Sequence, residues 1–403
     1  MSLLRLAWLS LWNRKLTVGL TVLSIALSVT LFLGVEKVRV GAKSSFTDTI
    51  SGTDLIVGAR TGSVQLLLYS VFRIGNATNN ITWQSYQDIA NRREVDWMVP
   101  MSLGDSHRGF RVMGTTADFF KHYKYRGKQS FAFASGSVVD GLNGAVVGAD
   151  VAKQLGYTIG QKIIVSHGLK SFIDHDDNPF RVTGILKKTG TPVDRTVIVS
   201  LEAIDAIHSQ GGHSAYNSQP TSVTAALVGV KSRLQIFKLQ RWINEYSEEP
   251  LLAIIPGVAL SELWTIMNTA EKAIIGVSLM VIATAFLGMV AMIFSSLNER
   301  RREMATLRAV GARPRTIIVL LSAEAALMSL FASLLGLGFF YIALLAARSY
   351  IDTQFGIYLE VGPPTLQDLK FLGFVIIIGT LAGLAPALRA YRVSLADGMR
   401  VRA

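Results

Sequence analysis

The sequence predicts an α-helical membrane protein with four transmembrane helices and a large α+β extracytoplasmic domain. Two observations lead to this fold class. Four long segments are apolar enough to cross a bilayer, for which about 20 residues suffice. Between the first and second of them, short β-type runs alternate with helical patterns. The predicted helices are therefore arranged one before and three after the domain.

The four spans are almost free of charge. Residues 16–35, 273–298 and 371–388 contain no charged side chain, and residues 316–347 contain only Glu324. From these we assign a cytoplasmic interfacial helix (1–15), a first span (16–38), the extracytoplasmic domain (39–268), a stalk with the second span (269–298), a cytoplasmic loop (299–315), a third span (316–347), a short periplasmic loop (348–370), a fourth span (371–388) and a cytoplasmic tail (389–403).

Basic residues set the expected orientation. Residues 1–15, 298–315 and 389–403 carry net charges of +3, +4 and +3, which is ten of the twelve net positive charges. All three fall on one side of a four-span topology, which places them and both termini in the cytoplasm. The basic composition therefore reflects topology, and we expect no nucleic-acid partner.

The first span is expected to be an uncleaved anchor. Its apolar run is long for a signal peptide, and Glu36, Lys37 and Arg39 follow it instead of a cleavage site. Ahead of it, Trp8 and Trp12 suit a short helix in the membrane interface.

The extracytoplasmic domain has no cysteine, so its hydrophobic core must stabilise it alone. Residues 141–200 are richest in strand and turn patterns and are a candidate separate lobe. Expected strands are Asp54–Val57, Gly109–Met113, Gly144–Val147, Lys162–Val165, Phe180–Ile185, Thr196–Ser200 and Thr224–Val230. Expected helices are Val64–Ile74, Thr82–Asn91, Ala149–Leu155, Leu201–His208 and Ser232–Tyr246.

After a break at residues 256–258, no strong helix breaker lies between Ser261 and Leu297. We favour a continuous helix that leaves the membrane as a stalk; the alternative is a plain linker.

The loop NERRREMATLRAVGARPR, from Asn298 to Arg315, is the most informative segment. As a helix it combines an apolar ridge, a basic rim, acids in the first turn and a glycine at the end. This composition makes the loop a candidate docking surface for a cytoplasmic partner. The residues expected to form this surface are Glu299, Arg300, Arg301, Glu303, Met304, Leu307, Arg308, Val310 and Gly311. The alternative is a loop that serves only topology.

The membrane portion resembles the permeases of the MacB/FtsX family, the type VII ABC transporter group. The resemblance rests on this loop followed by Ser322-Ala323-Glu324-Ala325, on the tail GLAPALRAYRVSLADGM and on the opening LAWLSLWNRKLTVGLTVLSIALS. Within the domain, GAVVGADVAKQLGYTIGQKI is similar in outline to the family's periplasmic domain.

The resemblance implies a homodimeric permease in the bacterial inner membrane that binds two copies of a cytoplasmic ATPase subunit. ATP and Mg²⁺ belong to that subunit, since this chain has no G-x-x-x-x-G-K-[ST] loop and is not itself an enzyme. Motion passing through the stalk would drive export, extraction or efflux of an envelope substrate. Membrane lipid and a periplasmic adaptor, lipoprotein or hydrolase are further expected partners.

Several intramembrane residues are candidates for coupling or packing. An ionisable residue at membrane depth is costly, so Glu324 is a candidate for coupling; the alternative is pairing with a nearby arginine. Small residues four apart, Gly379 with Gly383 and Ser24 with Ser28, permit close helix packing.

A cluster of His167, Asp174, His175 and Asp176 is the weak candidate for a metal site. Ordinary turn chemistry explains it better, and we expect no metal. Two other functions stay open: an FtsX-like signalling platform that activates an envelope hydrolase, and a membrane-anchored metal-binding or sensor protein.

Overall fold

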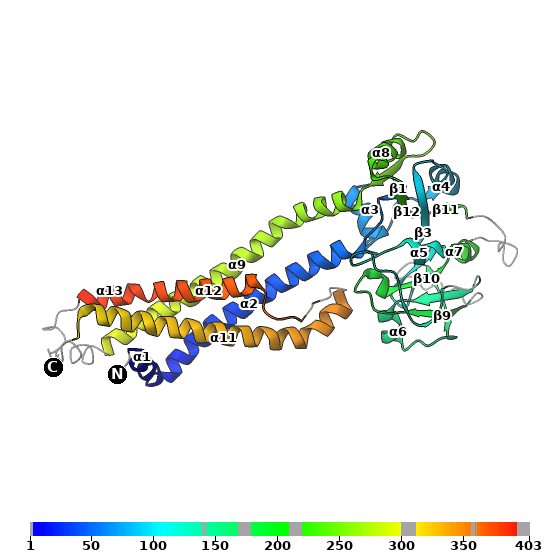
Figure 1. The fold of residues 1–403 in the computed structure, drawn as a ribbon. Coiled ribbons are helices and arrows are strands. Elements are labelled where there is room, and N and C mark those ends of the chain that lie inside the picture. Colours follow the sequence, from blue (N-terminus) through cyan, green and yellow to red (C-terminus); the bar gives the residue numbers. More distant parts are fainter. Residues whose placement is uncertain are drawn as a thin grey trace. The chain divides into compact units, whose positions relative to one another are not determined.

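A computed structural model describes residues 3–138, 141, 143–167, 179–208, 220–299, 312–355, 359 and 361–392. Contacts within the chain divide it into two compact units (Figure 1). The helical unit comprises Met1–Val40, Thr269–Tyr350 and Leu359–Ala403, and the sheet unit comprises Gly41–Asn268 and Ile351–Tyr358. Each is described by itself.

The four expected apolar helices are confirmed. Among the described residues, four helices are long and apolar enough to cross a membrane: Lys15–Ser44, Pro256–Ser295, Arg315–Ile351 and Leu366–Arg389. They belong to α2 (Lys15–Thr49), α9 (Pro256–Glu299), α11 (Pro314–Phe355) and the pair α12 (Leu366–Ala382) and α13 (Leu384–Arg392), and α1 (Leu3–Trp12) precedes them.

The helices are longer than the assigned spans. α2 continues past residue 38 to Thr49, and α11 continues to Phe355, within the stretch assigned to a periplasmic loop. α9 is one helix of 44 residues that begins at Pro256. The expected break at residues 256–258 is thus a helix start, because proline lacks only an N–H that the first turn leaves unpaired.

α12 and α13 divide the last span. Thr365 caps α12: its hydroxyl accepts from the Asp368 N–H at 3.2 Å, and Asp368 accepts from the Thr365 N–H at 2.8 Å. The helix ends at Ala382, and α13 starts again at Leu384 with Pro386 in its first turn, where no intrahelical N–H bond is lost.

The sheet unit is built on one mixed sheet. Its order is β13-β1-β12-β3-β4-β10-β6-β9-β5, with β7 on β9 and β8 on β3; β4 with β10 and β6 with β9 are parallel pairs. The strands are β1 (Leu55–Ala59), β3 (Val95–His107), β4 (Phe110–Thr115), β5 (Phe133–Gly136), β6 (Gly144–Val147), β7 (Lys162–Ile163), β8 (Ser166–His167), β9 (Phe180–Leu186), β10 (Thr196–Ser200), β12 (Ala225–Val230) and β13 (Leu251–Ile254). β2 (Ile81–Thr82) and β11 (Ser222–Val223) form a separate pair.

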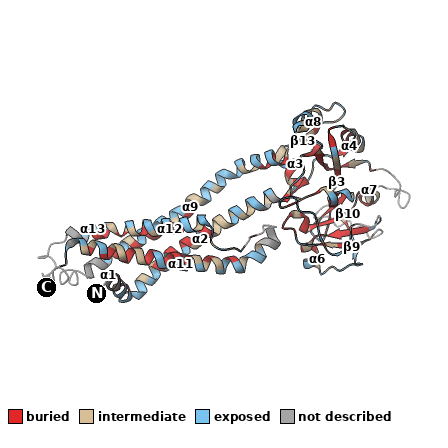
Figure 2. Cartoon of the chain, in the orientation of Figure 1, coloured by how far each residue is buried: buried red, intermediate tan, exposed pale blue. Residues whose placement is uncertain are grey.

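Helices cover both faces of this sheet. They are α3 (Ser63–Ser70), α4 (Trp83–Ala90), α5 (Asp118–His122), α6 (Ala149–Leu155), α7 (Leu201–His208) and α8 (Ile236–Asn244), with short 3₁₀ turns at Pro192–Arg195 and Arg233–Gln235. Buried residues concentrate on the strands, as Figure 2 shows. This is the expected α+β class.

Residues 141–200, the candidate lobe, share the sheet but have a core of their own on one face. Alternation along β10 places Ile198 in the large core that β1, β3 and β4 also line, whereas Val197 and Val199 pack with Phe110, Val151 of α6 and Ile204 of α7. A third core, around Tyr86, Ile89 and Leu239, covers the same face at the other end of the sheet.

The strand β3 was missed from sequence although it is the longest, with 13 residues. Pro100 and Gly104 interrupt its apolar pattern, and proline argues against a central strand. Pro100 keeps its acceptor role, since the Thr115 hydroxyl donates to its carbonyl oxygen at 2.7 Å. The ladder tolerates the missing N–H and shifts register between Leu103 and Ser106.

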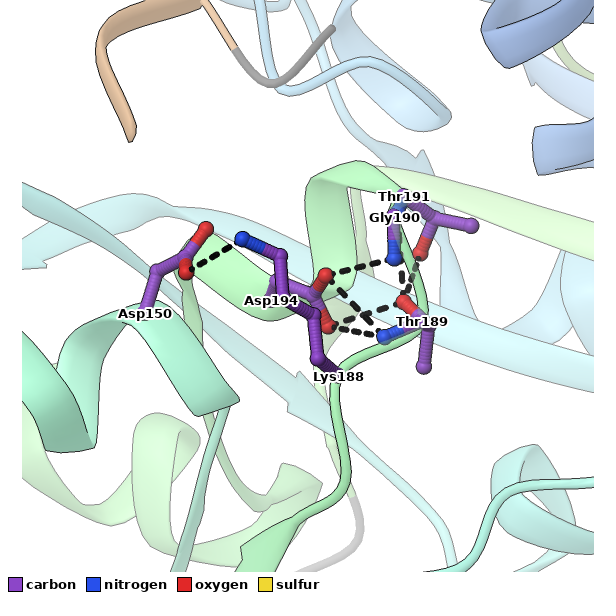
Figure 3. A network of polar contacts seen from close by, with 6 residues as sticks. All are labelled: Asp150, Lys188, Thr189, Gly190, Thr191 and Asp194. Carbon is purple, nitrogen blue, oxygen red and sulfur yellow. Dashed lines mark hydrogen bonds and ion pairs between the residues drawn. The ribbon is translucent and has the colours of Figure 1, made fainter. Parts of the chain in front are cut away.

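A buried polar network fastens the turn between β9 and β10 (Figure 3). The Asp194 carboxylate accepts from the Thr189 N–H at 2.9 Å, the Thr189 hydroxyl at 2.8 Å and the Gly190 N–H at 2.7 Å. Beside it, Lys188 Nζ lies 3.1 Å from Asp150 Oδ1. Burial raises the pKa of Asp194 to about 6, while these donors act in the opposite direction.

The raised pKa predicts a pH-dependent stability. Because the folded state holds the Asp194 proton more tightly than the ordinary pKa of 3.8 implies, its stabilisation is present at low pH and lost as pH rises through about 6. Asp194→Asn removes this titration. From about pH 4 to 6 the variant should gain stability relative to the wild type, by at most about 1.4 kcal/mol per pH unit, and above this window the difference should stay constant. Denaturant melts followed by tryptophan fluorescence measure this slope. The exposed Asp96→Asn is the control, and parallel slopes for wild type and Asp194→Asn would contradict the prediction.

Candidate functional site: the α2 and α9 helix pair

The two long helices enter the sheet unit at adjacent strands. α2 ends at Thr49 and the chain continues into β1, while β13 leads into α9 at Pro256. β1 and β13 are antiparallel, with Ile56 opposite Ile254 and Ala59 opposite Leu251. The start of β1 and the end of β13 therefore lie at the same end of the sheet, so both helices connect to one edge of it.

Side chains hold these helix ends within the sheet unit. Phe46 of α2 packs against Phe72 and Trp264, with ring centroids 4.3 and 5.7 Å apart. The Tyr123 hydroxyl donates to the carbonyl oxygen of Thr49, and burial raises the pKa of Tyr123, which keeps it a donor. Because Thr49 is the last residue of α2, this bond satisfies a helix-end carbonyl that has no intrahelical partner.

An ion-pair cluster links α2 to α9 within the helical unit. Arg39 donates two hydrogen bonds to the carboxylate of Glu36, one turn earlier in α2, from Nε at 2.8 Å and from Nη2 at 2.6 Å. Its Nη1 donates a third hydrogen bond to the carboxylate of Glu271 in α9 at 2.5 Å. The three side chains are 33%, 22% and 28% exposed. This bidentate ion pair with Glu36 fixes the plane of the Arg39 guanidinium. The third nitrogen therefore pairs with Glu271 at little additional loss of side-chain conformational entropy. We call these residues the Arg39 cluster.

Small residues pack the spans within the same unit. The Thr30 hydroxyl of α2 donates to the Gly336 carbonyl of α11 at 3.0 Å, and Phe32 stacks on Phe371 with ring centroids 3.9 Å apart. A Cβ at Gly379 would overlap Ser329 of α11, and one at Gly383 would lie 2.5 Å from the Ala325 Cβ. The G-x-x-x-G pair therefore lies where α12 and α13 touch α11.

The serine pair in the first span behaves differently. Ser28 is buried and its hydroxyl donates to the Ser24 carbonyl oxygen at 2.8 Å, but the Ser24 side chain is exposed.

Glu324 lies in α11 and is only 4% exposed. Its expected role in coupling stays a prediction.

The predicted docking surface lies almost wholly outside the described residues. Glu299 is the last residue of α9, and residues 300–311 are not described. The same holds for Asp174, His175 and Asp176, whereas His167 lies in β8. The described part of the chain contains no group of three or more potential metal ligands.

The Arg39 cluster was not predicted as a site. From the sequence, Glu36 and Arg39 were noted only as charges that follow the first span, and Glu271, which precedes the second span, was not considered with them. The available signal was their opposite sign, arginine after one span and glutamate before the next. Only the pairing of the helices shows that these charges meet.

A double-mutant cycle measures the connection between α2 and α9. Exposed ion pairs are worth about 0.2–1 kcal/mol, and we expect a coupling energy in this range between Arg39→Gln and Glu271→Gln. The second substitution should cost little once the first is present. Thermal unfolding of the full chain supplies the four values, with Lys37→Gln as the control partner. Additive effects of Arg39→Gln and Glu271→Gln would show that the pair does not connect the helices.

Two protein families match successive parts of the chain. The MacB-like periplasmic core domain family matches residues 18–246, and the FtsX-like permease C-terminal family matches residues 275–395. No curated protein matches the chain. Among solved structures, the chain is similar to the periplasmic region of MacB from Actinobacillus actinomycetemcomitans, at 11% identity and a TM-score of 0.35, covering 55% of this chain and 94% of that one. It is also similar to the extracellular domain of the noncanonic ABC-type transporter YknZ from Gram-positive bacteria, at 12% identity and a TM-score of 0.32, covering 50% and 99%.

The first family match alone spans more than half of the chain, and the second covers most of the residues after it. Members are permease components of ABC transporters, and their ATPase is a separate subunit. The chain belongs to the MacB/FtsX-like family of ABC transporter permeases.

Proposed function

We propose that this permease couples ATP hydrolysis by a separate cytoplasmic subunit to movement of its sheet unit, through displacement of α2 and α9. One observation carries the proposal. Each of these helices is unbroken beyond its apolar span: α2 ends at Thr49 and connects through residues 50–54 to β1, while α9 begins at Pro256 just after β13, and the two strands are paired. This movement would drive export, extraction or efflux of an envelope substrate.

The helices suit such a role because they are stiff. A helix passes on displacement only while its hydrogen-bond ladder is intact. α2 contains no proline, and α9 contains one only at its first residue. The Arg39 cluster and the Phe46–Trp264 contact hold the two helices to each other, each within its own unit. A shift of one helix is therefore resisted unless the other follows.

We further propose that the loop at residues 299–315 receives the ATPase. Its six arginines and its position between two apolar helices support a cytoplasmic location. ATP and Mg²⁺ then belong to the partner, because the chain has no phosphate-binding loop motif. Two permeases with two ATPase subunits, in the bacterial inner membrane, form the proposed complex.

Proline at Thr269 should break the coupling. Within α9 it removes one hydrogen bond and clashes with the preceding turn, at a cost of about 3 kcal/mol or more. Spin labels on cysteines at the exposed Thr265 of the two proposed permease copies report the distance between their sheet units, since the chain has no other cysteine. Their ATP-dependent distance change should disappear in Thr269→Pro, while ATPase binding and hydrolysis persist.

The matched control is Gly257→Pro, which places proline in the first turn of α9, where it is tolerated. It should retain the distance change. An unaltered change in Thr269→Pro, or no ATP-dependent change in the wild type, would exclude coupling through α9.

Leu307→Asp should detach the ATPase. A buried unpaired charge in a small interface costs several kcal/mol, so co-purification of the ATPase should fall at least tenfold. Leu234→Asp, at a leucine that is 92% exposed in the sheet unit, is the control and should leave the complex intact. The experiment also tests the orientation, because a loop on the other side of the membrane cannot reach the ATPase. Full co-purification with Leu307→Asp would remove the loop from the mechanism.

A further inference from the structure

A groove of about 250 Å³ lies between α1, the start of α2 and the middle of α11. All of it belongs to the helical unit. Its walls are almost wholly apolar and include Leu11, Val22, Met328, Phe331 and Leu335. We call it the α1 groove. A ligand that fills it must present a hydrocarbon surface.

Aromatic side chains form the α1 wall. The Trp8 ring packs on Phe331 and on Trp12, with centroids 5.4 and 6.1 Å apart. Trp8 and Trp12 remain 44% and 63% exposed, whereas Ala7 on the inner side of α1 is fully buried. Tryptophan prefers the headgroup level of a bilayer, where its ring is half apolar and half hydrated. The groove thus lies beside residues suited to the membrane interface.

One cation lines the groove. Lys15, the first residue of α2, contributes to its wall, and no carboxylate does. The sequence contains no Asp or Glu before Glu36. Within the part of the chain that the structure describes, Lys15 forms no ion pair. The positive charge is therefore available to a ligand.

We propose that the α1 groove binds an acyl chain of an anionic glycerophospholipid from the surrounding bilayer, with the phosphate against Lys15. An apolar slot with a cation and aromatic rings beside it matches the amphipathic shape of this lipid. The proposal rests on the membrane location of the helices and not on the coupling proposed above.

The charge of the lipid headgroup, and not the acyl chain, should determine which lipid the groove prefers. A lipid tail gains little by leaving the bilayer for an equally apolar groove. One lysine near the surface favours an anionic headgroup roughly fivefold. Anionic lipid should therefore occupy the groove at a lower mole fraction than zwitterionic lipid with the same chains.

Tryptophan fluorescence reports occupancy. Of the six tryptophans, Trp8 and Trp12 lie on α1, and the other four lie in the sheet unit. Brominated acyl chains quench a tryptophan only on contact. The full chain is reconstituted with brominated phosphatidylglycerol or brominated phosphatidylcholine at matched mole fractions. Half-maximal quenching should require roughly fivefold less of the anionic lipid.

Two pairs of variants separate the site from general lipid contact. Lys15→Gln should abolish the headgroup preference, while Lys272→Gln, the same change at an exposed lysine of α9, should retain it. Gly19→Leu should reduce quenching by both lipids, because Gly19 lines the groove and no atom lies within 4 Å of its added Cβ. Gly34→Leu has the same free space on α2 outside the groove and should behave as wild type.

Circular dichroism and gel filtration establish that each variant is folded. Equal quenching by the two brominated lipids in the wild type overturns the proposal. So does quenching in folded Lys15→Gln and Gly19→Leu that matches their controls.

Discussion

The pairing of β1 with β13 is the constraint on which the rest of the structure depends. β13 leads into α9, α2 connects to β1 through residues 50–54, and the backbone hydrogen bonds between the two strands place these two connections beside each other. Strand pairing also sets the register, because a slip by one residue would turn Ile56 away from its core and Leu55 into it. The alternation of apolar side chains along β1 therefore maintains the register at which β1 pairs with β13, next to the connections to α2 and α9.

Charge has two distinct uses in this chain. Most of the net positive charge lies in the segments next to the spans, and such a distribution of basic residues favours one orientation in a membrane. The Arg39 cluster acts locally, through two hydrogen bonds within α2 and one that joins α2 to α9. The first use needs only composition, whereas the second needs correct placement of α2 beside α9.

The sheet unit keeps polar groups at its turns and apolar groups on its strands. Asp194 shows the cost of an exception, since burial opposes its charge while three donors support it. Such a site tolerates little rearrangement, because a lost donor would leave a buried carboxylate under-satisfied. The turn between β9 and β10 is therefore held in one arrangement, and β10 is aligned between β4 and β6.

Features that depend on local sequence could be predicted. A membrane span needs only a sufficient length of apolar residues, so the four long helices were predicted. Short-range periodicity also predicted strands such as β6 and β10 and helices such as α6 and α7, with the bounds that the structure has. The continuous helix α9 followed from the absence of a breaker between Ser261 and Leu297. Residues 299–315, the predicted docking surface, were recognised from composition and resemblance, and their role remains a prediction.

Only the tertiary structure decided which distant segments meet. β3 was hidden because Pro100 and Gly104 break its pattern, and its partners β4 and β12 supply the pairing that makes it a strand. Glu36, Arg39 and Glu271 read as ordinary charges at the ends of spans, since nothing local shows that a residue of α2 faces one of α9. The α1 groove likewise joins positions more than 300 residues apart. Contacts at such separation depend on the packing of whole elements, and the sequence of any one element does not contain that information.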